Sequence, residues 1–256
     1  MPFTRVEPEK LSTSVIRQIE QLILRGILRP GERLPSEREL SEKLGVSRPS
    51  LRDAIADLQE RGLVTARPGS GIYVAEVLGS AFSPALRQLF ATHDEALFDY
   101  VAFRRDIEAM AAERAARLAT DADRAVLQEI FDKMEASHDR RDPERNARLD
   151  AQFHSAIIEA SHNVVMLHMM RSMYELLREG VFYNRQVMFA QQTSRAALLD
   201  QHRAINSAIQ ARDAEAASTA VRTHLGYVEQ ALRDDRRARH NAEVAEQRLA
   251  RERRHP

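Results

Sequence analysis

One stretch in the first third of the chain carries two helix-start signals in close succession, and it constrains the fold more than any other feature. Ser36, with Glu39 three residues later, forms the capping-box pattern that begins a helix. Gly45 supplies the residue type that commonly ends one. Ser47 then caps a further helix, and Pro49 fits its first turn, where the missing N–H costs nothing. The pattern predicts two short helices joined by a tight turn.

Two short β-prone runs follow these helices. They are Leu63–Ala66 and Ile72–Ala75, and the glycine-rich segment Arg67–Gly71 lies between them. Two such runs around a turn predict a hairpin. Before the capped helices, apolar residues recur at helical spacing and predict an amphipathic first helix: Leu11, Val15, Ile19, Leu22 and Ile23. Three helices followed by a hairpin make a winged helix-turn-helix, which we place at residues 8–77.

The rest of the chain shows helical periodicity and no strand pattern. The predicted fold class is therefore mainly α, with an N-terminal winged helix-turn-helix and a C-terminal all-α bundle of six or seven helices. We assign residues 78–94 to a linker and residues 95–235 to the bundle. Residues 236–256 form a charged tail, which we expect to be either a solvated helical extension or disordered. The candidate helices of the bundle are 95–119, 122–140, 144–160, 164–189, 194–211 and 213–237.

Charge and composition narrow the possible partners. Lys and Arg together number 38, as do Asp and Glu, so the net charge is zero and a general polyanion binder is excluded. Binding to specific DNA would then depend on a few well-placed arginines. Cysteine is absent, no apolar run approaches the roughly 20 residues of a membrane helix, and the first ten residues lack the apolar core of a signal peptide. We expect a cytoplasmic protein with no membrane partner.

The second capped helix has the residues of a DNA-reading helix. Such a helix presents polar and basic side chains near its N-terminus, where they reach base edges in the major groove. Arg48 and Arg52 are one turn apart and share a face, and arginine matches the acceptors of guanine. Ser47 and Ser50 are placed to donate to phosphates. The alternative is that these are solvated arginines on a small helical domain.

Histidines in the second half of the chain form a different pattern. Asp150 and His154 are four residues apart and face the same way on a helix. His202 and His224 lie beside apolar positions on two later helices, so both should point inward. Three imidazoles and a carboxylate can enclose a divalent metal and leave room for a ligand. The alternative is a set of hydrogen-bonded core histidines; others, such as His138, are scattered without an evident role.

The first of these patterns resembles the GntR family of bacterial regulators. The resemblance rests on Leu34–Leu40, which reads LPSEREL, and on Gly45–Ala54, which reads GVSRPSLRDA. It implies a homodimer that binds a palindromic operator in double-stranded DNA. The residues that it implies as DNA contacts are Arg38, Ser47, Arg48, Pro49, Ser50, Arg52 and the wing residue Gly69.

Residues 99–232 resemble the FCD effector domain of the FadR subfamily, through Asp-x-x-x-His and the two later histidines. The resemblance implies that Asp150, His154, His202 and His224 bind a divalent metal, Zn²⁺ first and Ni²⁺ as an alternative, beside a carboxylate effector. Arg104 matches an arginine that faces the same pocket and would bind the effector; the alternative is a bundle-surface salt bridge to Glu108. Similarity to members that respond to pyruvate, lactate or glycolate implies a small oxo- or hydroxy-acid.

The function we predict is a homodimeric transcription regulator, a repressor, whose operator binding is controlled by this acid. Two rivals remain. One is a metal-dependent hydrolase or lyase, for which Glu108 is the only acid or base that we can place near the metal. The other is an architectural DNA-binding protein without an effector.

Overall fold

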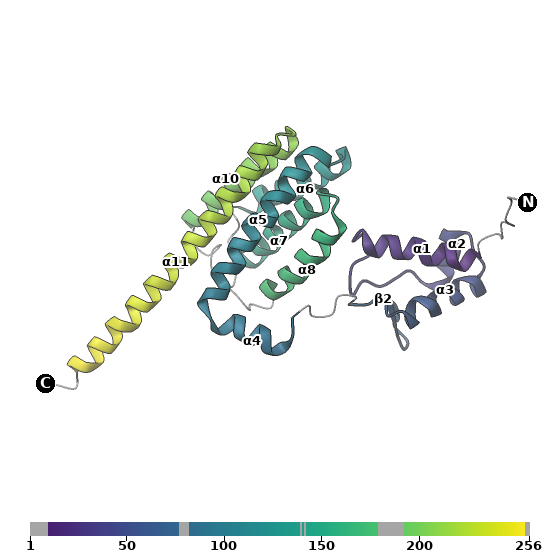
Figure 1. Ribbon diagram of the computed structural model, residues 1–256, viewed down its shortest axis with the longest axis horizontal. Helices are drawn as coiled ribbons and strands as arrows, with labels where there is room; N and C mark the ends of the chain where they lie inside the picture. Colours follow the sequence, from purple (N-terminus) through teal and green to yellow (C-terminus); the bar gives the residue numbers. More distant parts are fainter. Residues whose placement is uncertain (1–9, 77–81, 139, 141, 179–191, 254–256) are drawn as a thin grey trace, which may run out of the picture. The chain divides into compact units, whose positions relative to one another are not determined.

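The structure is a computed structural model that describes residues 10–76, 82–138, 140, 142–178 and 192–253. The chain divides into two compact units, Met1–Ala81 and Phe82–Pro256 (Figure 1). The mainly helical architecture with one small sheet confirms the predicted fold class. No helix in the described ranges is long and apolar enough to cross a membrane.

The N-terminal unit has the predicted order of three helices and a hairpin. Ser36 and Glu39 form the capping box, in which the Ser36 side chain accepts from the Glu39 N–H and the Glu39 carboxylate accepts from the Ser36 N–H. Gly45 ends the helix with φ +65°, in the left-handed region. The elements are α1 (Leu11–Leu24), α2 (Glu37–Leu44), α3 (Arg48–Glu60), β1 (Val64–Arg67) and β2 (Gly71–Val74).

The two strands pair antiparallel, with Val64 opposite Val74 and Arg67 opposite Gly71. A third segment, residues 31–34, lies along the outer edge of β2: the Leu34 N–H donates to the Ile72 carbonyl, and the Val74 N–H donates to the Glu32 carbonyl, both at 2.9 Å. The sequence interpretation placed only a turn here, because proline and glycine hide the short extended pairing. This edge segment ties the wing to the helices through buried Leu34.

The C-terminal unit contains seven helices among its described residues. The first of them, α4, lies inside the range 78–94 that we had assigned to a linker; Ser83 caps it and Pro84 occupies its first turn. The helices are α4 (Pro84–Thr92), α5 (Asp94–Leu118), α6 (Asp121–Ser137), α7 (Pro143–Ala160), α8 (Val164–Arg178), α10 (Gln192–Gln210) and α11 (Ala214–Glu252). Of the predicted helix 164–189, residues 179–189 lie outside the described ranges.

The helices of this unit pack around one apolar core. α5 and α11 lie side by side along much of their length (Figure 1). α5 has a run of fully buried alanines, whose small side chains allow neighbouring helices to approach closely: Ala109, Ala111, Ala112, Ala115 and Ala116. α7 contributes buried Phe153 and Ile157, and it packs against α5, α6 and α8.

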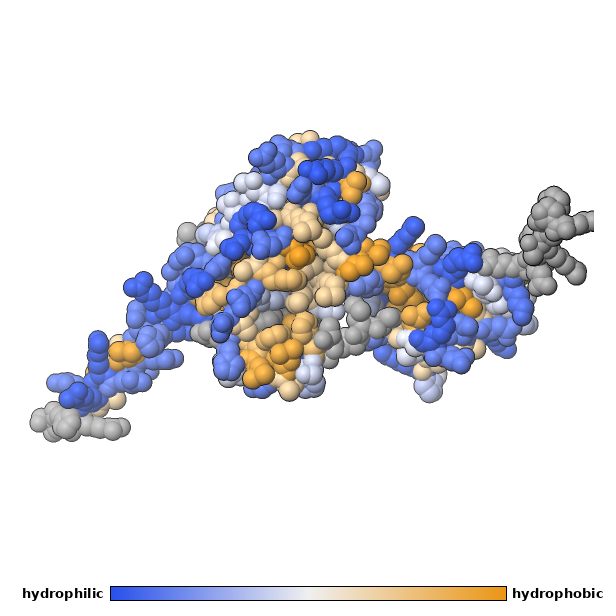
Figure 2. Space-filling model, in the orientation of Figure 1, coloured by the Kyte–Doolittle hydropathy of each residue, from blue (hydrophilic) through white to orange (hydrophobic). Residues whose placement is uncertain are grey.

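α11 continues without a break to Glu252, through most of the range that we had treated as a separate tail. Beyond Leu232 its side chains are mostly exposed, and this part of the helix is largely hydrophilic in Figure 2. Ion pairs one turn apart, such as Arg239 with Asp235, support it. We expected this stretch to be either a solvated helical extension or disordered. In its described residues it is a solvated helical extension.

Candidate DNA-binding surface and metal centre

The N-terminus of α3 presents its predicted DNA contacts to solvent. Ser47 caps the helix by accepting from the Ser50 N–H at 3.3 Å, and Pro49 lies in the first turn. Arg48 is exposed. The Arg52 side chain is 68% exposed, and its Nε donates to the Glu37 carboxylate at 2.9 Å. This contact holds Arg52 against α2 while leaving its terminal nitrogens available, an orienting role for Glu37 that sequence reasoning missed.

The other two predicted contacts lie on α2 and on the wing. Arg38 is exposed on α2, and Gly69 lies at the wing tip with φ +69°. The Arg67 guanidinium lies 4.2 Å from the centre of the Tyr73 ring, and the Tyr73 and Ser70 hydroxyls are 2.6 Å apart. These contacts order the wing around Gly69. Arg38, Arg48 and Arg52 are therefore all exposed, and the role of each residue in DNA binding stays a prediction.

The C-terminal unit brings the four predicted metal ligands together. Asp150 and His154 come from α7, His202 from α10 and His224 from α11. One donor atom from each lies within 4.8 Å of the other three, and all four residues are buried. His202 Nε2 lies 3.2 Å from Asp150 Oδ1 and 3.4 Å from His154 Nε2. The i, i+4 pair on α7 thus meets two histidines that are far away in sequence.

Two polar side chains orient these histidines from behind. Nδ1 of His154 lies 2.7 Å from Glu108 Oε2, a charge contact rather than a well-aligned hydrogen bond. Nδ1 of His224 lies 3.0 Å from Gln201 Oε1. Because the Nδ1 atoms meet these outer partners, the Nε2 atoms are left to face the cluster, as is usual for metal-binding histidines. The sequence offered no signal for Gln201, and it suggested Glu108 only as an acid or base for an enzyme.

Burial and charge set the protonation of the cluster. Burial lowers the pKa of His202, and burial together with the nearby His202 and His154 puts the pKa of His224 well below its usual range. Burial opposes the charged form of His154 as well, but Glu108 and Asp150 more than offset it and raise the pKa of that ring. His202 and His224 are therefore neutral at pH 7, which is the form of imidazole that binds metals.

The cluster fits a divalent metal. Two ligands about 2.0–2.1 Å from a tetrahedral ion are roughly 3.3 Å apart. The separations among Asp150 Oδ1, His154 Nε2 and His202 Nε2 are 3.2, 3.4 and 3.6 Å. Imidazole-rich sets of this kind suit Zn²⁺ and Ni²⁺. The donor set, its burial and its spacing therefore agree with the predicted site.

Arg104 has a buried position on α5. Its Nε donates to Glu108 Oε1 at 2.6 Å, and both side chains are 2% exposed. The alternative salt bridge to Glu108 thus exists, but inside the bundle rather than on its surface. Although burial opposes ionisation of Glu108, Arg104 and His154 hold the pKa of that carboxyl well below its usual range. The role of Arg104 as an effector contact stays a prediction.

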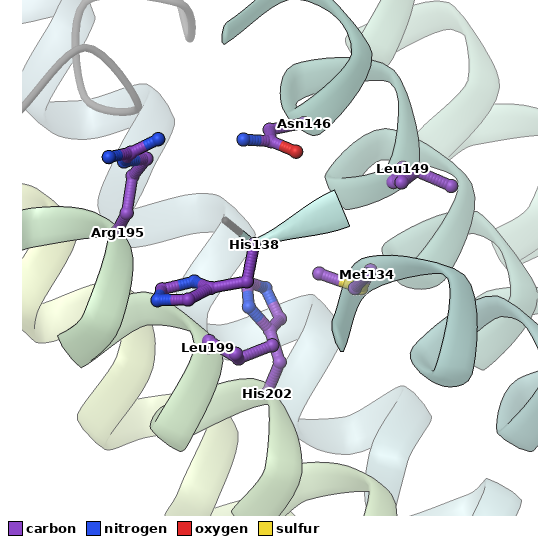
Figure 3. Close-up of a pocket in the computed structure, with 7 residues that line it drawn as sticks. All are labelled: Met134, His138, Asn146, Leu149, Arg195, Leu199 and His202. Atoms are coloured by element: carbon purple, nitrogen blue, oxygen red, sulfur yellow. The ribbon is translucent and has the colours of Figure 1, made fainter. Parts of the chain in front are cut away.

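A pocket opens onto the Asp150–histidine cluster at His202. The space within it, open solvent included, is about 300 Å³. Figure 3 shows the side chains around it, which come from α6 with its C-cap His138, from α7 and from α10. Its described lining residues are Met134, His138, Asn146, Leu149, Arg195, Leu199 and His202. They include no acidic residue, and Arg104 is not among them.

Known proteins resemble both units. Residues 11–74 match the model of bacterial regulatory proteins of the gntR family, and residues 99–227 match the FCD domain. A protein of Escherichia coli (strain K12) named for regulation of the L-lactate dehydrogenase operon is 35% identical over 92% of each chain. The Glc operon transcriptional activator of the same strain is 34% identical over 86% of this chain and 88% of its own length.

Two further comparisons agree. The transcriptional regulator LutR of Bacillus subtilis (strain 168) is 31% identical over 82% of this chain and 96% of its own. The solved structure of a GntR protein of Streptococcus agalactiae shares the fold, with a TM-score of 0.52 at 24% identity over 86% of this chain and 99% of that one. These relatives are regulators rather than enzymes. The chain belongs to the GntR family of bacterial regulators, with an FCD domain, and is a DNA-binding transcription regulator.

Proposed function

We propose that this regulator is a homodimeric repressor that a small oxo- or hydroxy-acid releases from a palindromic operator. The observation that carries the proposal is the buried cluster of Asp150, His154, His202 and His224, with a pocket opening onto it at His202. A site of this kind, in a chain with a separate DNA-binding unit, gives a small molecule a place from which to control DNA binding.

The four cluster residues would hold a divalent metal, Zn²⁺ or Ni²⁺. When bound, such an ion is a Lewis acid that binds oxygen atoms of a carboxylate or a hydroxyl group. The protein's own part is to fix the ligands: Glu108 holds His154, Gln201 holds His224, and the Arg104 charge holds Glu108 ionised.

The names of the relatives support this effector class. One is named for the L-lactate dehydrogenase operon and another for the Glc operon. They favour a small acid such as lactate, glycolate or pyruvate as the effector. An acid that binds more tightly to one dimer geometry than to another would shift the two DNA-binding units out of register with the operator half-sites.

A thermal-shift screen tests the proposal. The full chain would be freed of metal, reloaded with Zn²⁺ or Ni²⁺ and mixed with lactate, glycolate or pyruvate. Only a ligand that binds the native state raises its stability, by about 2.7 kcal/mol at a concentration 100 times its Kd. We expect an acid to raise the unfolding temperature of the metal-loaded protein and to leave that of His202→Ala unchanged. Full metal occupancy in His202→Ala would refute the assigned site.

A further inference from the structure

Arg195 is an arginine of the pocket whose Nε is buried without a hydrogen-bond partner in the described part of the chain. The residue lies near the start of α10, two turns before the metal ligand His202. Arg203, on the same helix, is different: it is half exposed and pairs with Glu135 and Asp200. Arg195 as a whole is partly exposed, but a buried N–H without an acceptor is costly, and an anion in the pocket would supply that acceptor.

Asn146 adds a second donor to the same pocket. The Ser137 hydroxyl donates to Asn146 Oδ1 at 2.8 Å, which fixes the orientation of the amide and leaves its NH₂ group free to donate elsewhere. In Figure 3 the amide nitrogen of Asn146 points toward Arg195, and the His138 ring lies between them and His202. The pocket is thus lined by two donors, Arg195 and Asn146, and by the predicted metal ligand His202.

Among the pocket's lining residues that the structure describes, none is acidic and could compensate the donors. Its described walls are the apolar side chains of Met134, Leu149 and Leu199. An arginine fork in such a setting binds a carboxylate with two parallel charge-assisted hydrogen bonds. The arrangement therefore selects for a ligand with a carboxylate at one end and a metal-binding oxygen close to it.

We propose that Arg195, assisted by Asn146, binds the carboxylate of the effector and is the residue that distinguishes an acid from its neutral analogue. This inference rests on the proposed function and adds the recognition of the acid to it. The 2-hydroxy or 2-oxo oxygen would then lie toward the metal that His202 and the other three cluster residues would hold. The ligand class is a small 2-hydroxy or 2-oxo monocarboxylate, and Arg195 is its specificity-determining residue.

Calorimetric titration of the zinc-loaded full chain with L-lactate and with its neutral amide, lactamide, tests this role. For the unsubstituted protein we expect binding of lactate and weaker binding of lactamide. Arg195→Gln should weaken lactate binding by about ten- to a hundredfold, since it loses a charge-assisted contact, and should leave lactamide binding and zinc content unchanged. Arg195→Lys, which keeps the charge but loses the fork, should lie between the two.

Arg203→Gln is the matched control, because it removes an arginine from the same helix outside the pocket, and it should bind lactate like the unsubstituted protein. Unchanged lactate affinity in Arg195→Gln would overturn the role of Arg195 alone. Loss of zinc in that variant would also overturn it, by showing a structural role. If the unsubstituted zinc-loaded protein bound neither lactate, glycolate nor pyruvate, the proposed function itself would fail, and this inference with it.

Discussion

At the scale of single residues, the two units use arginine in opposite surroundings. Arg48 and Arg52 stand exposed at the start of α3, whereas Arg104 is buried in an ion pair. An exposed guanidinium pays little to desolvate before it meets a base or phosphate, and a buried one fixes the groups around it. Because the net charge of the chain is zero, we expect DNA binding to depend on the few exposed arginines near α3.

Removing Arg48 tests the DNA-binding surface. Arg48→Ala should weaken binding to an operator selected in vitro by about 1–3 kcal/mol, because a bidentate contact to guanine is worth that much. Fluorescence anisotropy with a labelled duplex measures the change. Arg61→Ala is the control, since Arg61 follows the other end of α3 and pairs with Asp57 and Glu20. Equal affinity of the two variants would argue against base contact by Arg48.

Gln201 tests the support of the metal centre. Gln201→Ala should lower the zinc affinity about 10–100-fold, because the His224 ring loses the partner at Nδ1 that orients it. Competition with a fluorescent zinc chelator provides the measurement. Gln247→Ala, at an exposed position near the end of α11, should bind zinc as before. If both variants kept full affinity, His224 would not depend on Gln201.

Protonation of the cluster predicts a pH dependence for the metal-free protein. The folded-state pKa values of His202 and His224 lie below the ordinary value of about 6.5, so the unfolded chain binds more protons as the pH falls. Their contribution to stability is present above pH 6.5 and is lost as the pH falls toward the folded-state values. The raised pKa of His154 acts in the opposite direction, but on one ring against two. The chelator-treated C-terminal unit should therefore unfold at a lower temperature at pH 5.5 than at pH 7.5; the reverse order in calorimetry would show that His154 dominates.

At the scale of elements, the sequence predicted the helix starts that depend on interactions between residues close together in the chain. The capping box at Ser36 and the cap at Ser47 each involve residues three positions apart, so a single sequence carries the whole interaction. The i, i+4 pairing of Asp150 with His154 has the same local character. The helix α4 was missed because Ser83 and Pro84 were interpreted as part of a linker, although Ser83 caps this helix.

Features that depend on packing could not be predicted in this way. The pairing of residues 31–34 with β2 and the contact of Gln201 with His224 join positions that only the folded chain brings together. The place of Arg195 in the pocket is a further example, because the lining residues from α6 and α7 are far from it in sequence. The four candidate metal ligands were predicted with the help of a family resemblance. The residues that support them, such as Gln201, were identified only in the structure.

Two glycines with opposite expected effects test the element assignments. Gly45 has φ +65° with open space around a Cβ, so Gly45→Ala should destabilise the N-terminal unit by about 1 kcal/mol through backbone strain alone. Gly226 lies inside α11, also with open space, so Gly226→Ala should stabilise the C-terminal unit by about as much. Calorimetry that resolves both unfolding transitions would show the two shifts, and shifts of the same sign would contradict these backbone assignments.

At the scale of the whole molecule, the chain combines a DNA-binding unit with a helical unit that buries a metal-type cluster. The ion-pair and histidine contacts of that cluster join α5, α7, α10 and α11, so a ligand bound at His202 would contact a group that links four helices. A ligand changes an equilibrium only by its difference in affinity between two states. Control of DNA binding therefore requires that the acid prefer the dimer geometry with low operator affinity.

The most direct test of this account is the operator affinity of the full chain with and without acid, measured for zinc-loaded and for metal-stripped protein. An operator selected in vitro from random duplexes and anisotropy at one fixed salt concentration would give the four dissociation constants. We predict that lactate, glycolate or pyruvate weakens operator binding at least about tenfold in the zinc-loaded protein and has no effect on the metal-stripped protein. Operator binding that none of these acids changes in the zinc-loaded protein, or that changes equally without metal, would contradict it.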